Sequence, residues 1–214
     1  MSLKTRRGAG LTFIENTRPN HRVLIGIELR TRRGLIMNFF GGMAEKDDIS
    51  LFHTAVRETC EEILNIRLEA MILHELVELT RPRLIRQIEL ERGINWLVPI
   101  ELLGDYFKVL DQHSIPCPFN DEQRWSLYVR RGKLKLCEFI SDRWVVRNIS
   151  KPHTGLNEIV CLAYVPNRIL RDYCRLAEDS KSLRDAPAPD GFSDYYTRNV
   201  IMPTVCQSLK SFEE

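Results

Sequence analysis

Two runs of residues decide the fold: Phe39-Phe40-Gly41-Gly42 and, after a short acidic loop, Ala55-Val56-Arg57-Glu58-Thr59-Cys60-Glu61-Glu62. The second run predicts a helix, because its charged and apolar residues separate at the spacing of helical turns. Since a helix turns by about 100° per residue, Glu58, Glu61 and Glu62 fall within an arc of about 100°. The opposite side carries the residues that we expect to face the core, which are Phe52, Val56, Cys60 and Ile63.

Three carboxylates on one helix face repel one another unless a cation neutralises them. Arg57 can pair with Glu61, four residues further on, but one arginine does not neutralise three acids. Hard oxygen ligands on a rigid scaffold suit Mg²⁺ or Mn²⁺, which also bridge to substrate phosphates. The plainer interpretation of such a pattern is a solvated acidic face. The glycine turn at 41–42 and the adjacent Arg57–Glu58 pair favour a metal site instead.

This stretch resembles a Nudix box, the pattern G-x5-E-x7-R-E-U-x-E-E-x-G-U, in which U is a bulky aliphatic residue. The residues that match the pattern are Gly42, Arg57, Glu58, Glu61 and Glu62. Residues 35–42 also resemble the W-x-F-P-G-G run by which this family enters the loop, and residues 8–11 resemble its opening strand. The box resemblance covers about residues 35–66.

Four departures from the box affect the expected local structure. Asp48 stands where glutamate is usual, and eight residues instead of seven separate it from the arginine. Thr59 replaces the bulky aliphatic residue, and Leu64 replaces the glycine. Asn65 tolerates the left-handed conformation that ends a helix, so we expect the motif to shift by one residue and Ile66 to supply the aliphatic side chain.

The resemblance implies an α/β fold, the Nudix-type α/β/α sandwich with a mixed β-sheet. A chain of 214 residues exceeds the ~130–150 of a minimal domain of this kind, so we expect one core with additions and not two domains. The expected Nudix domain spans residues 1–175, with an insertion at about 103–150. Residues 176–214 are expected to form a C-terminal helical extension, a loop and a helix packed on the same domain.

Hydrophobic patterning and turn residues predict the individual elements. Ser50 is expected to cap a helix at 51–64. Helical and mixed segments are expected at 103–150, and a terminal helix at 193–212. The predicted strands are 9–15, 22–29, 35–39, 69–79, 84–91, 94–102 and 158–165.

Members of this family often take one more acid from a loop before the last strand. Tyr164-Val165-Pro166 resembles the family's step from that strand into the second helix, which makes Glu158 the expected acid. In a competing alignment, residues 96–99 (Trp-Leu-Val-Pro) form this step, and Glu89 or Glu91 supplies the acid. We expect the first alignment, because too few predicted strands precede Trp96 to complete the sheet.

The resemblance implies a metal-dependent pyrophosphohydrolase. The expected ligands of Mg²⁺ or Mn²⁺ are the Gly41 carbonyl, Glu58, Glu61, Glu62 and Glu158. The expected catalytic residues are Arg57, Glu58, Glu61, Glu62 and Glu158. Arg57 would orient Glu58 or Glu61, and one of the acids would serve as general base for water that attacks phosphorus in line.

The substrate class stays open between nucleotides and RNA. A net charge of +2 does not by itself indicate nucleic-acid binding. Basic residues nevertheless cluster at 4–7, 30–33, 81–86 and 130–135, as solvated loop tips or as a positive rim that holds a polyanion. The candidate substrate contacts are Arg30, Arg32, Phe39 and Gly42.

Three functions therefore remain. The first is a pyrophosphohydrolase acting on a nucleoside diphosphate linked to another moiety, such as ADP-ribose or a dinucleotide. The second is an mRNA-decapping enzyme that releases the cap nucleotide from RNA. The third is a catalytically degenerate Nudix-fold binding protein, which the departures at Asp48, Thr59 and Leu64 favour.

The remaining composition bears on the compartment. Six cysteines without close paired spacing indicate reduced thiols. No apolar run approaches the ~18 residues of a membrane span, and the first residues lack the shape of a signal peptide. We expect a soluble protein without membrane contact, cytoplasmic or nuclear and not secreted, with its oligomeric state open.

Overall fold

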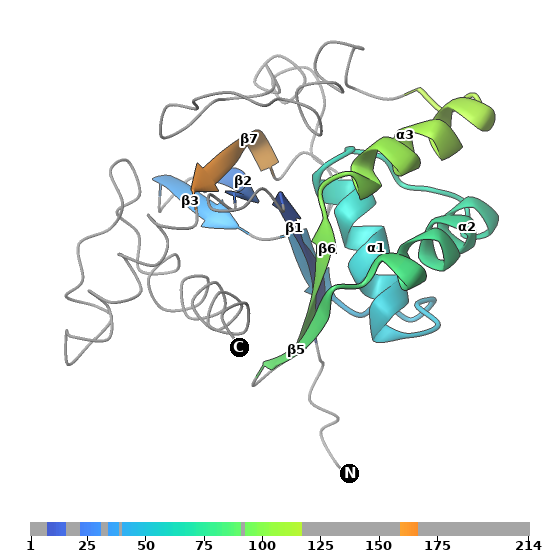
Figure 1. The fold of residues 1–214 in the computed structure, drawn as a ribbon, viewed down its shortest axis with the longest axis horizontal. Helices are drawn as coiled ribbons and strands as arrows, with labels where there is room; N and C mark the ends of the chain where they lie inside the picture. The colour runs from blue at the N-terminus through green and yellow to red at the C-terminus, as the bar shows by residue number, and fades with distance from the viewer. Residues whose placement is uncertain are drawn as a thin grey trace.

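A mixed β-sheet forms the centre of the fold in this computed structural model (Figure 1). The structure describes residues 8–15, 22–30, 34–38, 40–90, 93–116 and 159–166. Within them the sheet has seven strands, in the order β3-β2-β1-β6-β5, with β4 paired to β1 and β7 paired to β2. The strands are β1 (Gly8–Glu15), β2 (Arg22–Arg30), β3 (Gly34–Asn38), β4 (Phe40–Met43), β5 (Arg86–Leu90), β6 (Gly93–Pro99) and β7 (Ile159–Pro166).

Strand β1 organises the sheet. One of its edges pairs in parallel with β6, from Gly8 opposite Gly93 to Ile14 opposite Pro99. The other edge is shared between two antiparallel partners, because its first half pairs with β4 and its end pairs with β2. This sharing brings the glycines of β4 against the start of β1, with Gly41 opposite Gly10.

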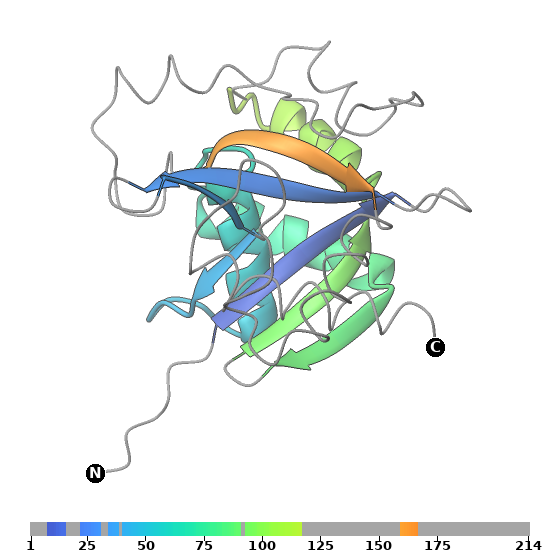
Figure 2. The same ribbon diagram turned by 90° about the vertical axis from the view of Figure 1, so that its left-hand side faces the viewer.

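The described helices all lie on one face of the sheet, behind it in Figure 2. They are α1 (Leu51–Glu62), α2 (Ala70–Thr80) and α3 (Leu102–Gln112), with a short 3₁₀ turn at Arg81–Arg83. The expected mixed α/β architecture is therefore confirmed. Among the described residues, a second helical layer that would complete a sandwich is not present. None of the described helices is long and apolar enough to cross a membrane.

Helix α1 packs on β1 and β4 through the apolar stripe expected from the sequence. Phe52, Val56, Cys60 and Ile63 are all buried in the main core, together with Leu11 and Phe13 of β1 and with Trp96 and Val98 of β6. A smaller cluster of Ile14, Ile88 and Leu97 lies apart from it. Since neighbouring residues of a strand point to opposite faces, Phe13 and Ile14 belong to different clusters.

Helix α1 begins at the predicted residue and ends two residues before the predicted 64, at Glu62. Ser50 is the N-cap, and its hydroxyl accepts a hydrogen bond from the His53 backbone N–H at 3.1 Å. Beyond the helix, Asn65 has a φ of 55°, and the Ile66 N–H donates to the Cys60 carbonyl at 3.1 Å. This bond spans six residues, one more than the closure of a Schellman motif, and it turns the chain back at the left-handed Asn65, the residue that the sequence predicted to end the helix.

One element predicted on this half of the chain is wrong, and another is confirmed but ends earlier than predicted. Residues 69–79 form helix α2 and not a strand, because their buried side chains recur at a helical spacing: Ile72, Leu73, Leu76, Val77 and Thr80. The strand predicted at 94–102 is β6, which ends at Pro99, and helix α3 begins three residues later at Leu102.

The structure leaves both alignments for the additional acid open, because β6 and β7 both belong to the sheet and end at Pro99 and Pro166. Five strands, β1 to β5, precede Trp96, and β6 leads from Trp96 through Pro99 into α3. Glu158 itself lies outside the described residues, as do Arg32, Phe39 and Glu91. The insertion beyond residue 116 and the predicted C-terminal loop and helix at 176–214 lie outside them as well.

Candidate active site

The acidic face of α1 is buried, not solvated. Glu61 and Glu62 are each only 3% exposed, and Glu58 is partly buried. Carboxylates rarely leave water unless charges or hydrogen bonds compensate them. The face must therefore be held by specific partners, and those partners define the site.

Arg57 is the central partner, and its side chain is only 9% exposed. Its Nε and Nη2 donate to the two carboxylate oxygens of Asp48, both at 3.0 Å. Its Nη1 donates to Glu61 Oε2 at 3.0 Å, and its Nη2 lies 2.9 Å from Glu58 Oε1 and 3.2 Å from the Met43 carbonyl. The predicted pairing of Arg57 with Glu61 is thus confirmed, and the same guanidinium fixes Glu58. Burial alone would lower the pKa of Arg57, but the bond to Asp48 and the charges of Glu58 and Glu61 raise it above its usual value.

Asp48 fastens the loop between β4 and α1. Besides Arg57, its carboxylate accepts hydrogen bonds from the Glu45 N–H at 2.8 Å and from Thr54 Oγ1 at 2.9 Å, and it lies 3.1 Å from His53 Nδ1. Burial opposes its ionisation, yet the hydrogen bonds from Arg57, the loop backbone, His53 and Thr54 hold its pKa well below the usual range. Asp48 therefore binds the arginine in spite of its shorter side chain and the additional residue before Arg57.

The two glycines of β4 shape the other side of the acidic face. The Gly41 N–H donates to Glu62 Oε2 at 2.7 Å. A Cβ on Gly42 would lie 2.5 Å from the Glu58 carboxylate, so only glycine leaves room for that group. A Cβ on Gly41 would meet backbone, lying 2.6 Å from the Ala9 carbonyl oxygen and 2.7 Å from the Gly10 Cα.

Alanine substitutions at these glycines should separate folding from site geometry. Gly41→Ala forces β1 and β4 apart, so we expect it to lower the free energy of unfolding by about 2–3 kcal/mol. Gly42→Ala meets only the flexible end of Glu58. We expect it to cost less than about 1 kcal/mol while moving Glu58 off Arg57. Urea unfolding of both variants checks this order, and an equal loss of stability would contradict it.

Glu61 carries a carboxylate oxygen without a hydrogen-bond partner. Its Oε1 is buried, and the nearest charge is Arg67 Nε at 3.5 Å, an ion pair too long for a hydrogen bond. Burial raises the pKa of Glu61 above its usual value, although Arg57 and Arg67 oppose the shift. An added cation, a water molecule or a proton would satisfy such an acceptor.

The donor set fits a hard divalent cation in its chemistry, because it consists of carboxylate oxygens and backbone carbonyls. The described residues do not gather three acidic, histidine or cysteine side chains closely enough to hold a metal ion in their present arrangement. Arg57 engages Glu58 and Glu61, and the Gly41 N–H engages Glu62. A cation would therefore require at least one carboxylate to turn from its present partner.

Several other candidate site residues from the sequence lie within the described part of the chain. Glu89 of the competing alignment lies exposed on β5, and Arg30 ends β2, opposite Gly34. In the basic cluster at 81–86, Arg81 and Arg83 are exposed and paired with Glu78 and Asp105, as expected for solvated loop tips. Phe13, Trp96 and Tyr106, aromatic residues that could have stacked a base, are buried in the structure.

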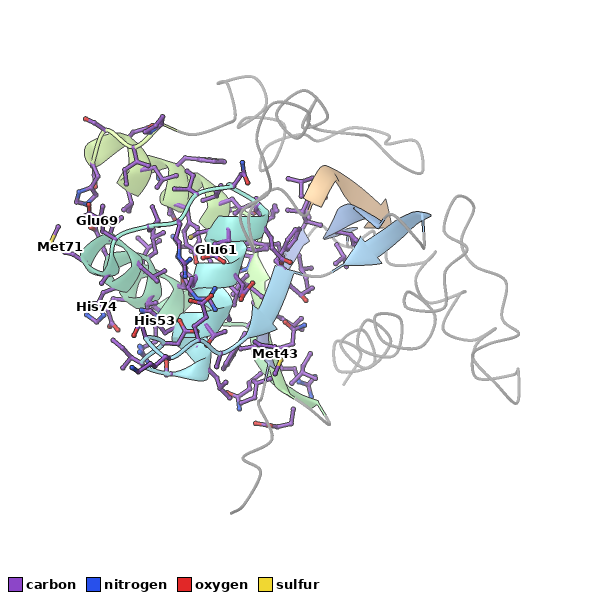
Figure 3. The ribbon with its side chains drawn as sticks, turned by 180° about the vertical axis from the view of Figure 1, so that it is seen from behind. Met43, His53, Glu61, Glu69, Met71 and His74 are labelled. Carbon is purple, nitrogen blue, oxygen red and sulfur yellow. The ribbon has the colours of Figure 1, made fainter. Side chains whose placement is uncertain are left out.

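Sequence reasoning missed Glu45 and Arg67. Arg67 Nη2 donates to Glu45 Oε2 at 2.6 Å, and Glu45 Oε1 lies 3.7 Å from Arg57 Nη1. Neither residue has a place in the box pattern, and the available signal was the helix end at Asn65, which turns the chain back toward α1. Figure 3 shows this side of the molecule, with His53 and Glu61 on α1 and Met43 at the end of β4.

No family model matches the chain, and no curated protein matches it. The geometry of the acidic face therefore has to carry the argument for function.

Proposed function

We propose that this protein is a Nudix-type, metal-dependent pyrophosphohydrolase that cleaves a phosphoanhydride in a nucleoside diphosphate linked to another moiety. The observation that carries the proposal is the burial of Glu61 and Glu62, beside the partly buried Glu58, behind a glycine turn, with Glu61 Oε1 left without a hydrogen bond. A solvated acidic face would not require an arginine bonded at once to Glu58, Glu61 and Asp48.

Glu58, Glu61 and Glu62, with the Gly41 carbonyl, are the residues that would hold Mg²⁺ or Mn²⁺. A bound divalent ion supplies charge neutralisation for the diphosphate and lowers the pKa of water. The chain's own residues do the rest. Arg57 orients Glu58 and Glu61 through its guanidinium, and the Gly41 N–H orients Glu62.

The reaction needs a proton acceptor beside the attacking water. A carboxylate of α1 or Glu158 takes this proton, the water oxygen forms a bond to phosphorus, and the bond from phosphorus to the bridging oxygen breaks. The leaving phosphate carries away the bridging oxygen. Arg57 contacts carboxylates on every side and acts as a positioning residue, not as a contact of the substrate.

A panel of substrates tests the proposal. ADP-ribose, diadenosine polyphosphates, NADH, nucleoside triphosphates and capped RNA are each incubated with Mg²⁺, with Mn²⁺ and with EDTA. We expect a nucleoside monophosphate from at least one linked diphosphate, and none with EDTA. A melting temperature that rises with Mg²⁺ and does not change its response in Glu62→Gln, with no hydrolysis of any substrate, would instead support a binding protein.

Salt separates a small nucleotide from capped RNA. Decapping would depend on many contacts to phosphates, so its kcat/KM would fall by a factor on the order of 10³ between 50 and 200 mM salt. Arg81 and Arg83 already have acidic partners, which favours the small substrate. We expect kcat/KM to fall less than about threefold over this range, and a steep fall with RNA as the best substrate would point to decapping.

A further inference from the structure

Two arginines that differ in exposure pair with Glu61 on the acidic face. The Arg57 side chain is 9% exposed, whereas that of Arg67 is 57% exposed. Arg57 is bonded to several groups at 2.9–3.2 Å. Arg67 has one short bond, to Glu45 Oε2 at 2.6 Å, and one longer ion pair, to Glu61 Oε1 at 3.5 Å.

The helix end places Arg67 beside Glu61. The left-handed Asn65 and the bond from the Ile66 N–H to the Cys60 carbonyl reverse the chain after α1. Ile66 then packs against the main core. Because Ile66 is anchored, the next residue emerges next to the last turn of α1, between that turn and the loop that carries Glu45.

Arg67 is the more distant and more exposed of the two partners of Glu61. Glu45, its other anchor, is itself 47% exposed, and ion pairs between exposed side chains contribute little to stability. The pair with Glu61 lacks hydrogen-bond geometry, so Glu61 Oε1 stays without a donor while Arg67 is beside it. A divalent cation would neutralise this oxygen more fully, and Arg67 can leave into solvent at little cost.

We propose that Arg67 takes the place of the divalent cation at Glu61 in the metal-free protein and competes with that cation for the carboxylate. This inference rests on the proposed function, because it takes Glu61 as a ligand. Arg57 cannot have this role, since it is buried and its bonds to Asp48 would have to break. Arg67 therefore lowers the affinity of the site for metal and keeps the buried acids partly neutralised without it.

Direct Mn²⁺ binding tests the proposal without any substrate. The free Mn²⁺ signal in electron paramagnetic resonance is titrated against wild type, Arg67→Ala, Arg67→Lys and Arg83→Ala. We expect Arg67→Ala to bind Mn²⁺ about fivefold more tightly, because a competing positive charge is gone. Arg67→Lys keeps the charge and should stay within about twofold of wild type.

Arg83→Ala is the matched control. It removes the same charge from an exposed arginine that is paired with Asp105 of α3 and not with Glu61, so its Mn²⁺ affinity should equal that of wild type. A rise in Arg83→Ala equal to that in Arg67→Ala would show an effect of net charge and overturn the proposal.

The outcomes also separate this inference from the function. If wild type binds Mn²⁺ and Arg67→Ala binds it equally or more weakly, Arg67 only fastens the loop, and the inference alone fails. If neither protein binds Mn²⁺, the metal site fails and the inference fails with it. Binding in Arg67→Ala but not in wild type would support both.

Discussion

Glu61→Gln is expected to lower kcat for phosphoanhydride hydrolysis about a thousandfold at saturating Mg²⁺. Glutamine keeps the shape of the side chain and one acceptor for Arg57 Nη1, which now lies 3.0 Å from Glu61 Oε2. It removes the charge that would hold the cation. Steady-state kinetics on the best substrate of the panel, with Mg²⁺ varied to saturation, measures the loss.

The same variant should remain folded. Burial raises the pKa of Glu61, so its ionised form costs free energy at neutral pH in the metal-free protein, and the neutral amide removes that cost. We expect its free energy of unfolding at pH 7 to equal or exceed that of wild type. Glu78→Gln, an exposed acid on α2, is the control and should retain activity. Full activity of Glu61→Gln at saturating Mg²⁺ would show that Glu61 is not a ligand.

Asp48→Asn is expected to lower the free energy of unfolding by about 3 kcal/mol at pH 7. The change leaves the buried Arg57 without the carboxylate that now accepts from its Nε and Nη2. It also weakens the bonds from the Glu45 N–H and Thr54, which order the loop. Urea denaturation followed by circular dichroism gives the difference.

The effect of Asp48→Asn should depend on pH in a fixed direction. The folded chain lowers the pKa of Asp48 below its ordinary value of 3.8, so the folded state favours the ionised form. That stabilisation is complete above the unfolded pKa and is lost as the pH falls below it. The difference between wild type and variant should therefore be constant from pH 7 to 5 and shrink at pH 3.

Asp47→Asn gives the matched comparison, because Asp47 is an exposed acid in the same loop. It should change the free energy of unfolding by less than about 0.5 kcal/mol at every pH. Equal losses in the two variants would mean that the bonds between Asp48 and Arg57 contribute nothing beyond the charge of the loop.

Local patterns in the sequence predicted most of α1 and its surroundings. The apolar stripe of the helix, its Ser50 cap and its left-handed end at Asn65 depend on residues within one or two turns of one another. The same holds for β1 to β3, whose apolar runs are bounded by turn residues. Short-range geometry is what periodicity and capping describe, so these predictions held.

Patterns of mixed period were less reliable. Residues 69–79 contain both alternating and helically spaced apolar residues. They form a helix, because the helically spaced set packs α2 against the core. The sequence also did not show that one edge of β1 pairs with both β2 and β4. The pairing of strands depends on residues far apart in the chain, which no local window contains.

The sequence by itself determined that three acids share one face of α1 and that an arginine lies among them. Only the tertiary structure decided that this face is buried, because burial comes from the packing of α1 on β1 and β4. It also decided which groups surround the face: Asp48 and Glu45 of the loop pair with its arginines, the Gly41 N–H of β4 bonds Glu62, and Arg67 from beyond the helix lies beside Glu61. Charges interact over a few ångströms of space whatever their separation in the chain, so a motif gives the members of such a cluster but not their partners.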